Sequence, residues 1–252
     1  MITCHFNQSS NLFRQIMVLL PPSTRTLFFS MGLLFSSVAQ ASLTTVPDSV
    51  ERWSTGFVPS SGCNGEIRAL AETQDVNGRI VVAGDFTVCG DTLVNRVALY
   101  DPINQIYEAL GSASVGVNGP INTALVHNNI LYVGGTFTQA GGIASPAIAQ
   151  FDLVDEQWAA LKTGITSSSP KVNDLAIFDG DLYVGGDFSQ VSGQPAADLI
   201  AWDLDGGEWL DAPPGTANGE IKTLLVADKP LDPSKDALYV GGSFTGAGGK
   251  SM

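Results

Sequence analysis

A unit of about 51 residues repeats along this 252-residue chain, and the period restricts the possible folds more than any other feature. Four glycine-containing apolar segments end in phenylalanines spaced by 51, 51 and 56 residues, namely Phe86, Phe137, Phe188 and Phe244. Two further aromatic markers keep the period of 51: Tyr100, Phe151 and Trp202, each followed by Asp, and Tyr107, Trp158 and Trp209. Three markers with one period indicate a repeat architecture.

Each unit is predicted to form four short strands. In the third unit these fall near 172–178, 181–189, 198–204 and 208–211, where apolar and polar residues alternate and Gly, Asn, Asp and Pro fill the gaps. Four strands in roughly 50 residues are typical of a β-propeller blade and not of a helical or leucine-rich solenoid. We therefore predict an all-β chain of four-stranded antiparallel blades, with about four blades present.

The predicted domain organisation is a signal peptide over 1–41 and a β-propeller over 42–252. The propeller would comprise an N-terminal strand around 50–55, three blades at about 65–118, 119–170 and 171–218, and a partial blade at 219–252. Trp53 lies 14 residues before Ile67, the spacing expected for the last strand of a preceding blade. That strand would either complete the last blade of a four-bladed disc or belong to a larger propeller of which this chain is a fragment, and the end of the chain in a strand-connecting loop favours the fragment.

An export signal is predicted at the N-terminus. Residues 27–38 form a short apolar run that follows Arg25 and precedes Ala39-Gln40-Ala41, as in a secretory signal peptide. The run is too short for a helix across a bilayer of roughly 30 Å, so no membrane insertion of the mature chain is expected. Translation from Met17 would give a signal of more usual length.

Charge excludes some partners. The chain has 12 Lys and Arg against 25 Asp and Glu, a formal net charge of -13. Nucleic acid is therefore not an expected partner, because phosphate binding needs clustered basic side chains. Attraction to anionic lipid is excluded on the same ground.

The repeated residues resemble a known family. An apolar strand ending in Gly185-Gly186 and followed by Trp202 and Trp209 looks like the kelch-type propeller repeat. The Leu-Tyr-Val-Gly-Gly-x-Phe form at 182–188 is similar to secreted bacterial repeat proteins and to the fungal cortical cell-polarity marker family of bud-site selection proteins. The first unit departs, with Ala83-Gly84 for the double glycine. The resemblance covers roughly 50–252 and implies the propeller fold, with little information about function.

The repeated positions have structural explanations. The paired glycines are expected to allow a bulge or a close approach of backbones, and the aromatic residues to fill the space between blades. Asp101, Asp152 and Asp203 are expected to bond the backbone of their own turns, with calcium binding as the lesser alternative.

Catalytic and metal-binding motifs are sparse. His127 is the one histidine left after signal removal, and one histidine with two cysteines cannot form a standard zinc site. A Ser-His-Asp triad would have to use His127, and the sequence contains no Gly-x-Ser-x-Gly motif. Gly248-Gly249-Lys250-Ser251 imitates a phosphate-binding loop, but Phe244 stands where its first glycine should be. We therefore predict no enzyme activity, no cofactor and no metal, although pairs of carboxylates could serve a glycosidase.

A disulfide is predicted between Cys63 and Cys89. Cys63 lies in the loop entering the first strand of a blade, and Cys89 in the loop leaving its second strand. These loops emerge at the same end of a four-stranded meander, and an exported protein meets an oxidising compartment. Two free thiols are the alternative.

The predicted function is that of a binding module. The polar loops 111–114, 163–169 and 213–216 should share one face with the loops between second and third strands. We expect an exported, non-catalytic propeller that binds a protein or a glycan in the periplasm, at the cell surface or outside the cell. The alternatives are the propeller part of a secreted carbohydrate-active enzyme, which would need two converging carboxylates in a pocket on that face, and a structural spacer of a surface protein.

Overall fold

The computed structural model describes residues 62–111, 116–211, 217–229, 232–247 and 250–251. The chain divides into two units, Met1–Gly62 and Cys63–Met252, and nearly all described residues belong to the second. The signal peptide predicted for 1–41 and the strand predicted around Trp53 lie outside the described residues. Every regular element in the described ranges is a β-strand, and no helix there could cross a membrane.

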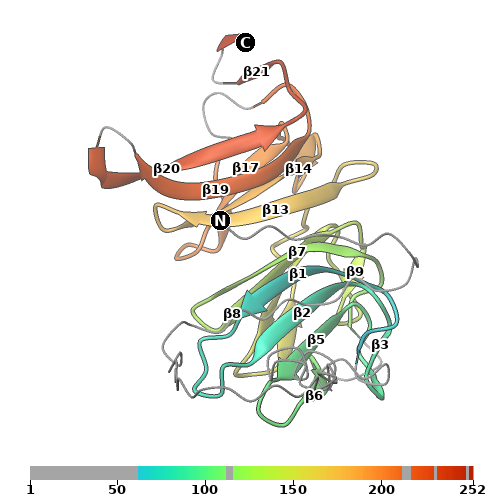
Figure 1. Ribbon diagram of the computed structural model, residues 1–252. Helices are drawn as coiled ribbons and strands as arrows, with labels where there is room; N and C mark the ends of the chain where they lie inside the picture. The colour runs from blue at the N-terminus through green and yellow to red at the C-terminus, as the bar shows by residue number, and fades with distance from the viewer. Residues whose placement is uncertain (1–61, 112–115, 212–216, 230–231, 248–249, 252) are drawn as a thin grey trace, which may run out of the picture. The chain divides into compact units, whose positions relative to one another are not determined.

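Three four-stranded antiparallel sheets, called blades 1 to 3, follow one another along the chain, and in each the strands pair in chain order. Figure 1 shows this order for the strands labelled β1, β2, β5 and β6, which form blade 1. Blade 1 contains β1 (Glu66–Glu72), β2 (Ile80–Asp85), β5 (Val97–Asp101) and β6 (Ile106–Ala109). Blade 2 contains β7 (Ile121–His127), β8 (Ile130–Gly135), β11 (Ile148–Asp152) and β12 (Gln157–Ala159). Blade 3 contains β13 (Lys171–Phe178), β14 (Asp181–Asp187), β17 (Leu199–Asp203) and β18 (Glu208–Trp209). The predicted all-β fold of four-stranded antiparallel blades is confirmed.

A fourth sheet, blade 4, pairs β19 (Ile221–Lys229) with β20 (Asp232–Gly242). These strands are equivalent to the first two strands of the other blades, because Ile221 pairs with Gly242 as Ile121 pairs with Gly135. The described part of blade 4 therefore repeats the inner half of a blade.

Small hairpins follow the second strand of each blade, where the sequence indicated only loops. They are β3 (Val88–Cys89) with β4 (Thr92–Leu93), β9 (Gln139–Ala140) with β10 (Ile143–Ala144), β15 (Gln190–Val191) with β16 (Gln194–Pro195), and β21 (Gly246–Ala247) with β22 (Lys250–Ser251). Strands of two residues are too short to show alternation. The turn residues Gly141 and Gly142 have φ of 60° and 79°, the left-handed backbone of a type I′ turn.

The paired glycines allow two close approaches, as the sequence predicted. The first strand of blade 2 has a bulge between Ile121 and Thr123, and a Cβ on Gly135 would overlap the Pro120 carbonyl oxygen beside it. A Cβ on Gly134 would overlap the side chain of Val172 in blade 3. One glycine therefore accommodates the bulge of its own blade, and the other brings the next blade into contact.

The apolar core lies between neighbouring blades. One cluster joins blades 1 and 2, a second joins blades 2 and 3, and a third joins blades 3 and 4. Third and fourth strands place their aromatic residues opposite each other, with ring centroids 5.0 Å apart for Phe151 and Trp158 and for Trp202 and Trp209. Phe151 is 1% exposed. The repeated aromatic residues are therefore packing residues, as expected.

Polar side chains also connect the first strands of successive blades. Asn122 donates to the carbonyl oxygen of Val172 (2.9 Å). The carboxylate of Asp174, at the bulge of β13, accepts the hydroxyl of Thr123 in blade 2 (3.3 Å) and that of Thr223 in blade 4 (3.1 Å). Because equivalent residues meet, the blades run in the same direction and their equivalent loops emerge at the same end.

Candidate functional site: the loop face and a pocket at blade 3

The end of the blades that carries the entry loops and the small hairpins is called the loop face. It consists of the residues that precede each first strand, around Asn64, Asn118, Ser167 and Asn218, together with the four small hairpins. Entry loop and hairpin of one blade bond to each other, as between the amide of Asn118 and the carbonyl of Gln139 (3.1 Å). The structure thus brings entry loops and second-to-third strand connections together, whereas residues 112–114 and 213–216 of the predicted face lie outside its described ranges.

An asparagine joins entry loop and hairpin in blades 1, 2 and 4. The side-chain oxygen of Asn118 accepts the amides of Thr138 and Gln139 (both 2.9 Å), and its Nδ2 donates to the Thr138 hydroxyl (2.8 Å). Asn64 and Asn218 make the same three bonds in blades 1 and 4. A glycine follows each of these three asparagines. In blade 1 the reason is steric, because a Cβ at Gly65 would overlap the carbonyl oxygen of Asp85.

The predicted disulfide strengthens the same junction in blade 1. Cys63 and Cys89 are bonded, and their backbones form an isolated β-bridge between entry loop and hairpin. The equivalent bridge in blade 2 joins Val117 and Ala140, both buried. A covalent bond therefore takes the place of an apolar contact.

Blade 3 departs from this arrangement. Ser169-Pro170 stands where the other blades have Asn-Gly, and the hairpin amides are bound by Ser167 instead. The hydroxyl oxygen of Ser167 accepts the amides of Ser189 (2.8 Å) and Gln190 (2.9 Å). Ser167 lies two residues before the position that asparagine has in the other blades, and the short side chain of Ser169 takes that position.

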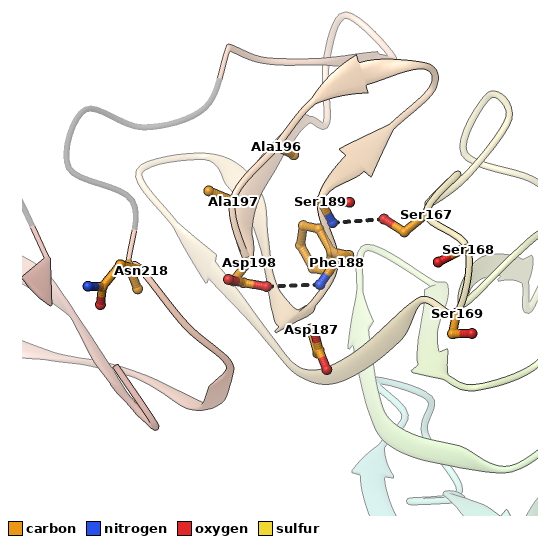
Figure 2. A pocket seen from close by; sticks show the side chains of 11 residues that line it. Ser167, Ser168, Ser169, Asp187, Phe188, Ser189, Ala196, Ala197, Asp198 and Asn218 are labelled. Atoms are coloured by element: carbon orange, nitrogen blue, oxygen red, sulfur yellow. Dashed lines mark hydrogen bonds between the residues drawn. The ribbon is translucent and has the colours of Figure 1, made fainter. Parts of the chain in front are cut away.

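A pocket of about 470 Å³ opens at this position. Figure 2 shows its lining, with the serines on one side, Asn218 on the other and two carboxylates between them. The lining residues are Ser167, Ser168, Ser169, Asp187, Phe188, Ser189, Ala196, Ala197, Asp198, Ala217 and Asn218. Phe188 is 4% exposed, so the available groups are hydroxyls, an amide and carboxylates.

The pocket has an anionic character. Burial raises the pKa of Asp198. The backbone amide of Phe188 donates a hydrogen bond to Asp198 Oδ1 (2.9 Å) and lowers this pKa, whereas the nearby carboxylates of Asp187 and Glu220 raise it. Lys171, whose strand partner is Asp187, directs its Nζ to Glu220 (2.9 Å). Within the described part of the chain, neither Asp187 nor Asp198 forms an ion pair.

The repeated aspartates lie at the opposite end of the blades and shape turns, as predicted. Asp152 accepts the amides of Val154 (2.8 Å) and Asp155 (3.0 Å), and these amides lower its pKa. Asp101 and Asp203 bind the backbone of their own turns in the same way. In each of these aspartates the Oδ1 atom therefore accepts two backbone amides of its own turn.

The remaining candidate residues are separate from the pocket. His127 ends β7, at the end of the blade opposite the loop face, and its Nε2 lies 3.1 Å from Asn128 Nδ2. Among the residues described, no three His, Cys, Asp or Glu side chains gather in a way that could hold a metal ion.

The sequence interpretation missed the asparagine junctions and the pocket. A signal was available, because Asn64, Asn118 and Asn218 are each followed by glycine and each lie three residues before an isoleucine of a first strand, namely Ile67, Ile121 and Ile221. Blade 3 breaks that pattern with Ser169-Pro170. That Asp187 and Asp198 line the same pocket could be seen only in the structure.

The four-stranded blades define a β-propeller. The family model of the Rax2 C-terminal beta propeller domain matches residues 53–179, and the chain belongs to this family. This agrees with the predicted resemblance to the cell-polarity marker family.

Two solved structures match part of this chain. The extracellular domain of a one component system from B. thetaiotaomicron is 14% identical with a TM-score of 0.44, over 71% of this chain and 21% of that chain. The WD40 domain of Neurospora crassa Pan2 is 12% identical with a TM-score of 0.37, over 72% of this chain and 55% of that chain. This chain thus spans about a fifth and about half of these two chains. No match was found among curated proteins.

Proposed function

We propose that this chain is an exported, non-catalytic binding module that recognises a protein or a glycan at the cell envelope through its loop face. The observation that supports this most is the pocket at blade 3, where Ser167 makes the junction in place of an asparagine and hydroxyl and carboxylate groups line the space beside it. Propellers carry ligands on such loops, because the sheets beneath hold the loops rigidly.

Export is supported by the disulfide between Cys63 and Cys89, since such bonds persist in oxidising compartments and are rare in the cytosol. The signal peptide predicted for residues 1–41 agrees with it. The periplasm, the cell surface and the extracellular space all satisfy both observations.

Matched substitutions on opposite ends of the blades test the proposal. Gln190 in β15 and Gln157 in β12 are both exposed, but only Gln190 belongs to the loop face. Binding of the full chain to envelope fractions and to immobilised glycans should fall at least severalfold in Gln190→Arg and stay unchanged in Gln157→Arg. Equal binding by both variants, or no binding by the wild type, would contradict the proposal and favour a structural spacer.

Glycoside hydrolysis is a second candidate, because the pocket does contain the two carboxylates that an enzyme would need. Two features favour binding instead. The Phe188 amide already occupies Asp198 Oδ1, and the Phe188 ring is buried and cannot stack on a sugar. A panel of chromogenic glycosides decides between them: hydrolysis that Asp198→Asn abolishes would establish the enzyme.

A further inference from the structure

Blades 1 and 3 place different charges on the same two backbone positions. Asp85 and Asp187 each precede the buried phenylalanine of their blade, Phe86 or Phe188. Arg96 and Asp198 each precede the third strand and donate their amides to that phenylalanine's carbonyl oxygen, at 2.7 and 3.1 Å. Both have a left-handed backbone, with φ of 73° and 61°. The two pairs of positions are therefore structurally equivalent.

In blade 1 the pair is complementary. Arg96 Nε lies 3.6 Å from Asp85 Oδ1, so the chain itself supplies a guanidinium to the carboxylate. In blade 3 Asp198 replaces that arginine and adds a second carboxylate beside Asp187. Lys171 is bound to Glu220, and no other described cation replaces the missing one.

The pocket lies where a side chain could supply the missing charge. Asp187 and Asp198 both line it, and so do the hydroxyls of Ser168 and Ser169, each of which can accept a hydrogen bond. Its volume of about 470 Å³ can hold the end of a long side chain. A guanidinium has five N–H donors in a plane and binds several oxygen acceptors at once, whereas an ammonium is a point charge.

We propose that the pocket at blade 3 binds an arginine side chain presented by a partner protein. The inference rests on the proposed function and narrows its ligand from a protein or glycan to a protein with an exposed arginine. The net charge of -13 attracts such a partner over a longer range. Blade 1, with Arg96 beside Asp85, shows the same contact made within the chain.

The test uses the full chain and a short probe, acetyl-Gly-Arg-Gly-amide, with the citrulline analogue as a neutral control of the same shape. Backbone amide signals of Ser168 and Ser189 in NMR spectra should shift with the arginine peptide, and the citrulline peptide should bind at least tenfold more weakly. Higher salt should weaken the binding of the arginine peptide, because the pocket is open to solvent and its charges are screened.

Variants locate the interaction. Asp187→Asn and Asp198→Asn should each weaken the binding of the arginine peptide by about threefold to tenfold, as expected for partly exposed charge pairs. Glu72→Gln removes the same charge from an exposed site on β1 and should have no effect. Equal binding of the two peptides, or insensitivity to both aspartate substitutions, overturns the inference. If Gln190→Arg still abolishes envelope binding in that case, the proposed function stands without the arginine; if it does not, both fail.

Discussion

Blade 2 and blade 3 have the same four-stranded sheet, an aromatic pair at equivalent positions and the same buried glycines, yet their loop ends differ. In blade 2 Asn118 closes the junction between entry loop and hairpin with three hydrogen bonds. In blade 3 Ser167 closes it, and a pocket with two carboxylates remains. The comparison teaches that residues which keep the period hold the sheets together, and residues which break it are the candidates for recognition.

The largest effect is expected where the period is strict. Trp158→Ala removes an indole whose ring centroid lies 5.0 Å from that of Phe151 and which packs against the cluster between blades 1 and 2. The free energy of unfolding should fall by about 3–5 kcal/mol. Chemical denaturation measures it. Trp209→Ala in blade 3 should cost a similar amount, and a much smaller cost in one blade would show that the two cores are not equivalent.

The next effect concerns the covalent junction of blade 1. Cys63→Ser with Cys89→Ser should lower the free energy of unfolding by about 3 kcal/mol, mainly because the unfolded chain gains freedom. The masses of the alkylated wild type with and without reductant provide the control. Full alkylation without reductant would mean that the bond is absent.

A smaller effect is expected at the hydrogen-bonded junctions. Asn118→Ala should cost about 1–2 kcal/mol, because three hydrogen bonds are lost at an exposed site. Ser167→Ala should cost about 1 kcal/mol, through the loss of the acceptor for two amides. Amide hydrogen exchange at Thr138 and Ser189 should quicken only in the blade that is changed; exchange that quickens in both would contradict independent junctions.

The smallest effects on stability are expected for Asp198→Asn and Asp85→Asn, and they should have opposite signs. The raised pKa of Asp198 means that its ionisation opposes folding as pH rises through the folded-state pKa. Asp198→Asn, which keeps an acceptor for Phe188 and tolerates a positive φ, should therefore stabilise the fold at pH 7 by about 0.5 kcal/mol, since solvent screens the site. The difference should vanish below the unfolded-state pKa of about 3.9.

Asp85→Asn in blade 1 should have the opposite effect. It removes the partner of Arg96 at a half-exposed site and should destabilise the fold by about 0.5 kcal/mol at pH 7. Thermal melts of both variants at pH 7 and at pH 3 provide the measurement. The same sign for both at pH 7 would contradict the assignment of opposite charge environments to the two blades.

The sequence predicted most of the fold because its period is carried by large buried residues. Phe137, Phe151 and Trp158 recur at fixed spacing since each blade must pack against the next. The four strands predicted in the third unit begin and end within about two residues of β13, β14, β17 and β18. The disulfide followed from the topology of one blade.

The site could not be predicted in the same way. Asp187 and Asp198 are one pair among 25 acidic residues, and only the hairpin geometry places both at one pocket. The role of Asp174 between three blades was missed for the same reason, because its partners lie 50 residues away on either side. A period shows which positions are equivalent, but the contacts at positions that depart from it depend on tertiary structure.

A double-mutant cycle tests most directly whether blade 3 has the vacant counterpart of the arginine site in blade 1. Asp198→Arg would place the guanidinium where blade 1 has Arg96, and its effect on the free energy of unfolding is measured in the wild type and in Asp187→Asn. Asp198→Arg should lower the free energy of unfolding by about 0.5–1 kcal/mol less in the wild type, where Asp187 is present, than in Asp187→Asn. This difference is the coupling energy between positions 187 and 198, and it should become smaller in high salt. A coupling energy of zero, or one that favours the Asp187→Asn background, would contradict the account.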